Sequence, residues 1–413
     1  MSRTIAIINT ILIACLALAC LGGLVWANTV YVRQQPVEKN FLVPWLGART
    51  FIQYGDSPYS DPATQRAQIL YYGRLASQGQ DPLALWLPFP FELFYFPFAL
   101  IGNYALARAA WMVCLEIALV ALAFLSLRLT GWKPNRIFLP IILLFPLVWV
   151  FGVIAWTGAS ADGFIALAVA GFLLALEGEQ EELAGALLVV MAGAARVTGI
   201  LVLFMLWWVI YQRRWRMVWG ALMTLAVMLG LAFLFLPDWF LPFLHGLLVH
   251  FTASPGISSV GILASWSPVV GLRLGWLLAA VLLLLLFLEW GKTLKKDFRS
   301  LFWTACLTLS ITPLLGIPMV PGEYLALFLP LLLFLSILAE RRPWIKQSTV
   351  AETMLVALLL GSWALIIGLV KANAYRPLIN GLMLLLPVLL VPGLYWMRWW
   401  YLHTAPTRLE PPP

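Results

Sequence analysis

Few charged residues lie inside the long apolar runs of this 413-residue chain, and those few are the first candidates for chemistry. Glu92, Glu116 and Arg196 each interrupt a stretch that is otherwise hydrophobic. A charge near the middle of a bilayer costs roughly 2.5–3.5 kcal/mol on insertion scales, so it normally has a partner, water or a ligand. Glu116 and Arg196 could form a buried structural ion pair. Alternatively, the forked guanidinium of Arg196 could bind an anionic lipid or substrate group.

A second group of candidates lies in the polar segment 28–84, which separates two apolar runs. Taken singly, its carboxylates could be turn formers or solvated charges, but together, beside a membrane surface, they suit a polar substrate. Residues 41–52 carry apolar side chains at helical spacing, which predicts an amphipathic helix on the membrane surface. The turn-forming sequence GDSPYSDP at 55–62 should end that helix. The carboxylates are Glu38, Asp56, Asp61 and Asp81.

The segment 237–272 holds two of the three histidines, His245 and His250, among prolines and tryptophans. Tryptophan commonly anchors a helix at the membrane interface, so this segment could be a simple interfacial helix. Alternatively, it could form a second wall of the same external site, where a histidine would be available to a phosphate. Both interpretations place the histidines on the outer side of the membrane.

The elements that must position these residues are strongly apolar. The chain is 62% hydrophobic and 11% charged, and its mean hydropathy is +0.92. Soluble domains are about 45–50% apolar and about 25% charged, so this is an integral membrane protein. It should be all-α, because backbone polar groups in lipid must be satisfied within the protein.

Charge and cysteine content exclude several other functions. The net charge of +8 could indicate nucleic-acid binding, but the basic residues fall between apolar runs, as membrane anchors do, so no nucleic-acid partner is expected. The four cysteines lie inside apolar runs, without the spacing of a disulfide framework or a metal site. The motifs GxxxxGK(S/T), GxGxxG, HExxH and GxSxG are absent. Nucleotide-driven chemistry and metalloproteolysis therefore have no support.

Apolar runs long enough to cross a bilayer of about 30 Å occur about twelve times along the chain. We expect one membrane domain over 1–413, with outer loops at 28–84 and 237–272 and a cytoplasmic tail at 401–413. The runs are 5–27, 85–101, 105–128, 137–155, 162–177, 182–211, 217–236, 273–290, 300–318, 323–339, 351–371 and 378–400.

Short basic loops predict the orientation, because cytoplasmic loops are enriched in Lys and Arg. If every run spans once, the basic segments agree with cytoplasmic N- and C-termini. That arrangement also puts GWKPNR (131–136) and the acidic EGEQEE (177–182) outside. An alternative makes 85–101 re-entrant and splits 182–211 into two half-helices, which puts 131–136 inside. The basic segments are 211–216, 292–299, 340–346 and 397–403.

The loop after the first run resembles that of a known family. Its pattern is similar to D-F-x-x-(Y/W)-x-x-A-R, then G-x-x-P-Y, then a proline-containing second helix. These features occur in polyprenol-phosphate-sugar-dependent glycosyltransferases of the GT-C superfold, in particular bacterial glycosyltransferase family 87, which is mannosyltransferase-like. The matching residues are Asn40-Phe41, Trp45, Ala48-Arg49, Gly55-Asp56-Ser57-Pro58-Tyr59 and LPFP at 87–90, with further similarity at RRWR (213–216), LPDWFLPFL (236–244) and TPLLGIPMVPGEYLALFLP (312–330).

The resemblance implies a GT-C-like bundle of about 12 transmembrane helices, with large outer loops after helices 1 and 7. It also implies one carboxylate that takes the acceptor's proton and cations that stabilise the departing phosphate. This chemistry requires neither a metal nor a cofactor, so none is expected. The family's usual catalytic aspartate corresponds to Asn40, and an amide cannot act as a base. Glu38, Asp56 or Asp81 would then serve, or the chain does not catalyse transfer. The residues expected to bind substrate or lipid phosphate are Arg49, Tyr59, Arg196, His245 and His250.

The expected function is transfer of a hexose, with mannose as one option, from a polyprenyl-phosphate donor to a glycan or glycolipid acceptor. Attack from the face opposite the leaving phosphate would invert the anomeric centre. The expected location is the cytoplasmic (plasma) membrane of a bacterial cell, and membrane lipid is a further partner. Two alternatives remain: a catalytically inactive relative that binds lipid-linked sugar, and a lipid or solute transporter, in which broken helices and buried charges also occur.

Overall fold

The computed structural model describes residues 3–253, 257–341, 347–371 and 381–402. Over these residues the chain is helical, with one isolated backbone bridge between Ile257 and Met319 and no strand. The all-α class expected from composition is therefore confirmed.

Two compact units divide the chain, and each is described by itself. The divisions near 117 and 228 fall inside the long helices α6 (Tyr104–Thr130) and α12 (Trp215–Phe235), so each of these helices contributes to both units. Unit 1 comprises Met1–Ile117, Trp156–Ser160 and Leu229–Ser254, and unit 2 comprises Ala118–Ala155, Ala161–Met228 and Pro255–Pro413.

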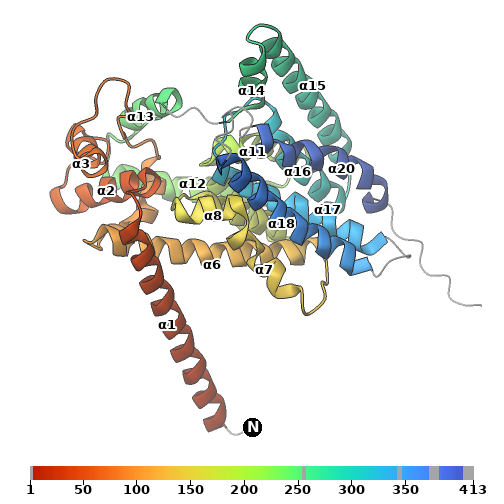
Figure 1. The fold of residues 1–413 in the computed structure, drawn as a ribbon, viewed down its shortest axis with the longest axis horizontal. Helices are drawn as coiled ribbons and strands as arrows, with labels where there is room; N and C mark the ends of the chain where they lie inside the picture. Colours follow the sequence, from red (N-terminus) through yellow and green to blue (C-terminus); the bar gives the residue numbers. More distant parts are fainter. Residues whose placement is uncertain (1–2, 254–256, 342–346, 372–380, 403–413) are drawn as a thin grey trace, which may run out of the picture. The chain divides into compact units, whose positions relative to one another are not determined.

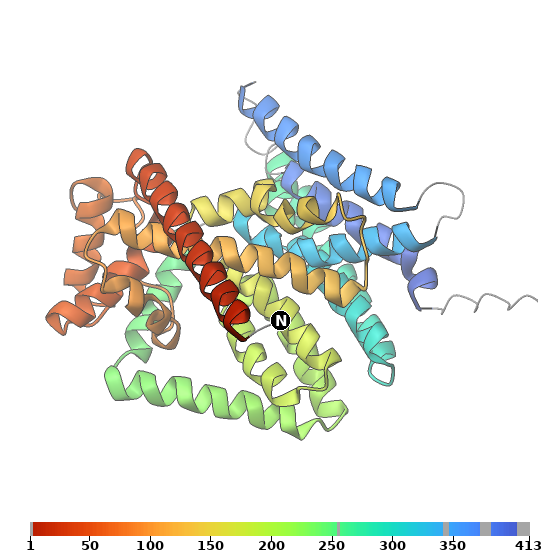
Figure 2. The ribbon, with the colours of Figure 1, turned by 90° about the horizontal axis from the view of Figure 1, so that it is seen from below.

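The helices follow one another along the chain as coloured in Figure 1 and, from a second direction, in Figure 2. Before α6 the elements are α1 (Arg3–Gln34), α2 (Lys39–Tyr54), α3 (Asp61–Tyr72), α4 (Phe89–Glu92), the 3-10 turn η1 (Leu93–Tyr95) and α5 (Phe96–Ala99). Between α6 and α12 they are α7 (Leu139–Val148), α8 (Val150–Thr157), α9 (Asp162–Glu177), α10 (Glu181–Ala192) and α11 (Ala195–Tyr211). After α12 they are α13 (Phe240–Ala253), α14 (Ser259–Trp266), α15 (Val270–Thr293), α16 (Phe298–Ile311), η2 (Thr312–Leu314), η3 (Pro321–Leu327), α17 (Phe328–Arg341), α18 (Gln347–Lys371) and α20 (Leu385–Leu402).

Six helices of the described residues are long and apolar enough to cross a membrane, or seven if the bent pair α7–α8 forms one span. The expected number of about twelve is not confirmed, because several apolar runs form helices that are short or broken. The six are Tyr104–Thr130, Trp215–Phe235, Val270–Thr293, Pro321–Ala339, Val350–Gly368 and Gly381–Leu402.

The helix predicted over residues 41–52 is present as α2. Its residues 41–48 are all buried in unit 1, on every face of the helix, so a position on the membrane surface is not confirmed. It ends at Tyr54, where Gly55 adopts a left-handed backbone (φ 72°) and its N–H bonds the carbonyl of Phe51. Glycine is favoured at this position because it has no Cβ to clash.

The run 85–101 does not form one helix. Pro88, Pro90 and Pro97 divide it into α4, η1 and α5, each of three or four residues. Pro90 and Pro97 lie in the first turns of α4 and α5, where the missing N–H removes no helical hydrogen bond. This segment is therefore folded within unit 1 and is not a straight span.

A sharp bend also interrupts the run 137–155. The axes of α7 and α8 differ by 54°, with Trp149 in an extended conformation between them. Gly152 packs on the carbonyl of Pro146, and a side chain at 152 would overlap that oxygen. Proline and glycine together thus account for the bend.

The run 182–211 is broken into α10 and α11, which corrects the single-span topology. α10 ends at Ala192, and α11 starts again at Ala195. Arg214, just beyond α11, pairs with Glu181 at the start of α10, with 3.3 Å between Nη1 and Oε1. The chain therefore returns to the end of unit 2 from which it entered, as two half-helices.

The acidic segment EGEQEE consequently lies beside the basic segment YQRRWR and not on the opposite side. A second ion pair joins Arg216 to Glu182, at 3.4 Å. Gly185 and Gly220 lie where α10 and α12 touch backbone to backbone, and a Cβ at either position would overlap the other helix. Small residues are typical where helices in a membrane approach this closely.

Further hydrogen bonds show that basic loops of unit 2 lie close to one another. The Gln212 side-chain amide donates to the Leu294 carbonyl, which joins the 211–216 and 292–299 segments. The Asn135 N–H donates to Glu352 Oε1, at 3.3 Å, which places GWKPNR beside the start of α18. The second contact agrees with the alternative topology, in which 131–136 lies with the cytoplasmic loops.

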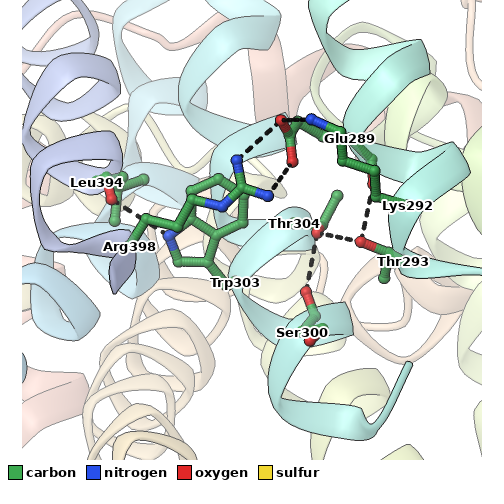
Figure 3. Close-up of polar contacts among 8 residues, drawn as sticks. All are labelled: Glu289, Lys292, Thr293, Ser300, Trp303, Thr304, Leu394 and Arg398. Atoms are coloured by element: carbon green, nitrogen blue, oxygen red, sulfur yellow. Dashed lines mark hydrogen bonds and ion pairs between the residues drawn. The ribbon is translucent and has the colours of Figure 1, made fainter. Parts of the chain in front are cut away.

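A polar cluster holds the C-terminal helix α20 to α15 and α16 (Figure 3). The Glu289 carboxylate, on a residue 5% exposed, accepts two bonds from the Arg398 guanidinium, at 2.9 and 2.7 Å, and pairs with Lys292 Nζ at 3.1 Å. Arg398 also lies over the Trp303 ring, whose N–H donates to Leu394 O. One carboxylate thus joins two cations from different helices.

Replacing Glu289 by Leu is expected to lower the free energy of unfolding by about 3 kcal/mol, because Arg398 then loses its partner in a largely buried position. The control is Glu182→Leu, which disrupts an exposed ion pair and should cost less than about 1 kcal/mol. Reversible unfolding by SDS in mixed micelles measures both. Equal stability of the two variants would contradict this role for Glu289.

The α10–α11 hairpin makes a prediction about sidedness. In a variant whose native cysteines are replaced, single cysteines at Glu179 and Arg213 should react with a membrane-impermeant maleimide from the same side of the membrane. A cysteine at Gln78, in the 28–84 loop, is expected to react from the other side. Labelling of intact spheroplasts and of inverted vesicles distinguishes the sides. If the cysteine at 179 reacts from the same side as the one at 78, the hairpin is wrong.

Candidate active site

Arg108 is a buried guanidinium in unit 1, with 1% of its surface exposed. Its Nη1 donates to the Pro36 carbonyl at 3.1 Å, and its Nη2 donates to the Thr157 carbonyl at 2.6 Å. Small residues surround it in the sequence ALARAAW, which lets other segments approach α6 closely. This one side chain therefore ties the start of the 28–84 loop to the end of α8.

Glu38 lies at the N-cap position of α2, within electrostatic reach of Arg108. Its backbone N–H donates to the Tyr104 hydroxyl at 3.0 Å. Burial raises the pKa of the Glu38 carboxyl, and the neighbouring charges of Arg108 and Lys39 oppose that rise. A carboxyl with a raised pKa is a better proton acceptor near neutral pH, so Glu38 meets one requirement for a base.

The other predicted base positions lie in the same loop. Asn40 is exposed in the first turn of α2. Asp56 pairs with Arg66 at 3.7 Å, and Asp81 pairs with Lys39 at 2.6 Å. Both aspartates are thus held by partially exposed cations within the loop itself.

Two of the predicted binding residues stabilise the loop in unit 1. The Arg49 guanidinium donates to the Ala99 carbonyl at 3.0 Å and lies over the Trp45 ring. The Tyr59 hydroxyl donates to the Leu87 carbonyl at 2.6 Å. These bonds fasten the loop to the segment 85–101.

The helix α13, which carries both predicted histidines, belongs to the same unit as the 28–84 loop. Trp239, just before it, belongs to a buried cluster with Phe89 and Ala232, against which Tyr59 packs. Gly246 lies directly on the Leu85 carbonyl. The adjacent His245 is exposed, whereas the His250 side chain lies outside the described residues. The segment 239–246 thus contacts the first loop, as the two-wall interpretation requires.

Two of the three charged residues singled out in the apolar runs lie in unit 1. Glu116 accepts a hydrogen bond from the Asn28 amide at 2.9 Å. Glu92 is fully buried, one of its oxygens lies close to Gly47, and its carboxylate interacts with the Tyr59 side chain and with the backbone of Ala48. Both acids therefore have polar groups beside them within unit 1.

Arg196, the third charge, belongs to a second cluster, in unit 2. It lies in the first turn of α11, directly after the break that separates α11 from α10. The Glu323 carboxylate interacts electrostatically with Arg196 and with Asp162, the first residue of α9. One Asp162 oxygen lies against the Cα of Gly322, where a side chain would overlap it. Three segments distant in sequence thus bring two carboxylates and one guanidinium together.

Sequence reasoning identified Arg196 but missed Asp162, Glu323 and Arg108. Asp162 and Glu323 each follow a short glycine-containing turn at the edge of an apolar run, where an acid is ordinarily a helix-start residue. Arg108 lies near the start of an apolar run, where an arginine is ordinarily a membrane anchor. In each case the only signal in the sequence was a charged residue at the boundary of an apolar run. Charged residues at such boundaries are common in membrane proteins as helix-start acids or membrane anchors, so the signal did not indicate a site.

Comparison with known proteins identifies the family. A family model described as glycosyltransferase family 87 matches residues 87–318, which is more than half of the chain. The chain belongs to glycosyltransferase family 87. Searches of curated proteins and of solved structures find no match. The matched part of this glycosyltransferase contains Arg108, Asp162 and Arg196, whereas Glu38 and Asn40 precede it.

The family and the fold together establish a coarse function. The protein is a glycosyltransferase, and its apolar helices make it a multi-pass membrane protein. The resemblance stated from the sequence is confirmed: the matched residues include its motifs at 87–90, 213–216 and 236–244, whereas its motifs in the 28–84 loop precede the match.

Replacing Arg108 by Met is expected to loosen the start of the 28–84 loop, because the carbonyls of Pro36 and Thr157 lose their donor. Each buried unsatisfied group costs about 1–3 kcal/mol. Hydrogen exchange followed by mass spectrometry should show faster exchange over residues 36–45, relative to the wild type. The control Arg74→Met, at an exposed position of the same loop, should leave that exchange unchanged. Equal exchange in both variants would refute the role given to Arg108.

Proposed function

We propose that this glycosyltransferase moves a hexose, with mannose as the first sugar to test, from a polyprenyl-phosphate donor to a glycan or glycolipid acceptor. The observation that carries the proposal is Arg196, a guanidinium at a helix break among apolar helices in the family-matched region. A donor with a lipid tail and a phosphate suits such a place, because the tail is soluble in the membrane and the phosphate needs a cation.

The forked donors of a guanidinium match phosphate oxygens in a bidentate arrangement. In the proposed reaction Arg196 binds the bridging phosphate and stabilises the charge that develops as the bond to the sugar breaks. The lipid phosphate is already a good leaving group, so no general acid is required. A single displacement inverts the anomeric centre.

The proposed orientation follows from the grouped basic loops. The segments 211–216 and 292–299 and the end of α20 lie together in unit 2. Under the positive-inside rule this end faces the cytoplasm, and the N-terminus, the C-terminus and GWKPNR lie on that side too. Asp162 and Glu323, at the start of α9 and of η3, then lie toward the outer face of the plasma membrane.

One observation favours a second candidate, a non-catalytic relative that binds lipid-linked sugar. Asn40 replaces the residue that the resemblance assigns as base, and it is exposed. Such a protein would bind the donor through Arg196 but would release no polyprenyl phosphate.

The proposal is tested with purified protein, radiolabelled polyprenyl-phosphate mannose and other polyprenyl-phosphate hexoses, and a mixture of membrane glycolipids as acceptors. Wild type should release polyprenyl phosphate as sugar appears in the acceptor. Arg196→Met should raise the KM for donor at least about tenfold, because a charge-assisted hydrogen-bonded contact contributes about 1.5–3 kcal/mol. The KM of Arg196→Lys for donor should lie between those of wild type and Arg196→Met, since lysine retains the positive charge but lacks the forked donors of a guanidinium.

Arg216→Met is the matched control, because it removes an exposed arginine of the same unit and should leave the KM for donor unchanged. Donor binding by wild type without release of polyprenyl phosphate would establish the non-catalytic candidate. Transfer with an unchanged KM in Arg196→Met would remove Arg196 from the phosphate site.

A further inference from the structure

The cluster around Arg196 contains more than a phosphate-binding cation. Two carboxylates, from Asp162 and Glu323, lie within electrostatic reach of each other and of the guanidinium. An isolated structural ion pair needs one acid for each arginine. The second acid therefore needs a reason of its own, because two neighbouring carboxylates repel each other when both are ionised.

Backbone structure fixes both acids. Glu323 Oε2 accepts a hydrogen bond from the Val320 N–H at 2.7 Å, which orients its carboxylate at the start of η3. Asp162 lies at the first position of α9, and its Oδ2 lies against Gly322. Because glycine has no Cβ, position 322 leaves the space that this oxygen occupies. Preorganised groups of this kind are typical of catalytic sites.

A buried tyrosine next to the acids provides a second, independent observation. Tyr324 has 0% of its surface exposed, and its hydroxyl has no hydrogen-bond partner among the described residues. That hydroxyl lies within electrostatic reach of the Glu323 carboxylate. A buried hydroxyl without a partner costs free energy, so a ligand with a polar group is the natural partner for it.

The carboxylates of the 28–84 loop are less suited to the role of base. Asp56 and Asp81 each pair with a cation of the loop, and Asn40 is an amide. Glu38 has a raised pKa but lies at the N-cap of α2, beside the structural residue Arg108.

We propose that the Asp162–Glu323 pair is the general base of the transfer reaction, and this proposal rests on the function proposed above. One carboxylate of the pair takes the proton of the acceptor hydroxyl as its oxygen attacks C1 of the hexose. The C1–O bond to phosphate breaks, and its electron pair leaves with polyprenyl phosphate, whose charge Arg196 stabilises. The bond formed joins the acceptor oxygen to C1, and the proton then passes from the carboxylate to water.

The test uses the full-length protein and the polyprenyl-phosphate hexose on which the wild type is active. Asp162→Asn and Glu323→Gln keep the size of each side chain but remove its basicity. At least one of the two should lose at least about a hundredfold in kcat, as expected for removal of a general base. Its KM for donor should stay within about threefold, because the phosphate-binding guanidinium remains; a residue needed only for folding would not separate kcat from KM in this way.

A third variant moves the acid without changing any charge. Gly322→Ala places a methyl group where Asp162 Oδ2 lies and should also lower kcat by at least about tenfold. Gly361→Ala is its control, since a Cβ at 361 meets no atom within 4 Å. Glu182→Gln, an exposed acid of the same unit, controls for loss of negative charge. Both controls should keep wild-type kcat.

Glu38→Gln tests the competing assignment, in which the general base is a carboxylate of the 28–84 loop. If both Asp162→Asn and Glu323→Gln keep more than a hundredth of the wild-type kcat, the pair is not the base, and loss of activity in Glu38→Gln would then assign the role to the loop. Wild type without transfer activity on any hexose donor would instead refute the proposed function itself, so the two failures are distinct.

Discussion

Backbone amides and carbonyls that leave a helix inside a bilayer must find partners within the protein, and this requirement governs where the chain can be irregular. The helices here are interrupted at 85–101, between α7 and α8, and between α10 and α11. At the first site proline removes donors that would otherwise be unsatisfied. At the second, glycine lets one segment lie on the carbonyl of another. The first break therefore leaves fewer donors without partners, and the second depends on close packing of the backbone.

The same requirement explains why polar side chains occur near the breaks. Arg196 directly follows the gap between α10 and α11. Glu323 lies in the first turn of the 3-10 helix η3, which precedes α17. In unit 1, Arg108 satisfies carbonyls at the ends of two other segments. A charged side chain at a break can thus complete local hydrogen bonding and also face a substrate. For that reason, a charged residue at a helix boundary does not by itself indicate whether its role is structural or functional.

Local features of the fold could be predicted from the sequence, and features that depend on distant contacts could not. The start and end of α2 follow from apolar spacing and from Gly55, because neighbouring residues determine both. The sequence predicted the break at Gly193–Ala194 only in the alternative topology. Hydropathy is averaged over a window of many residues, so two small residues at a turn do not interrupt an apolar run. The meeting of Asp162 with Glu323 depends on how α9 and η3 pack, which no local pattern encodes. The family could be inferred from the sequence because each of its motifs is a short local pattern.

The α10–α11 hairpin has a consequence for the parity of membrane crossings. A segment that returns to its starting face contributes an even number of crossings, so exchanging one single span for a hairpin reverses the side of every later loop. In the alternative topology 85–101 is re-entrant as well, so the two exchanges, at 85–101 and at 182–211, cancel each other. Loops before 85 and after 211 therefore keep their sides, and only the stretch between them is inverted. This is why the basic segments after 211 are compatible with both topologies, whereas GWKPNR, inside the inverted stretch, distinguishes them.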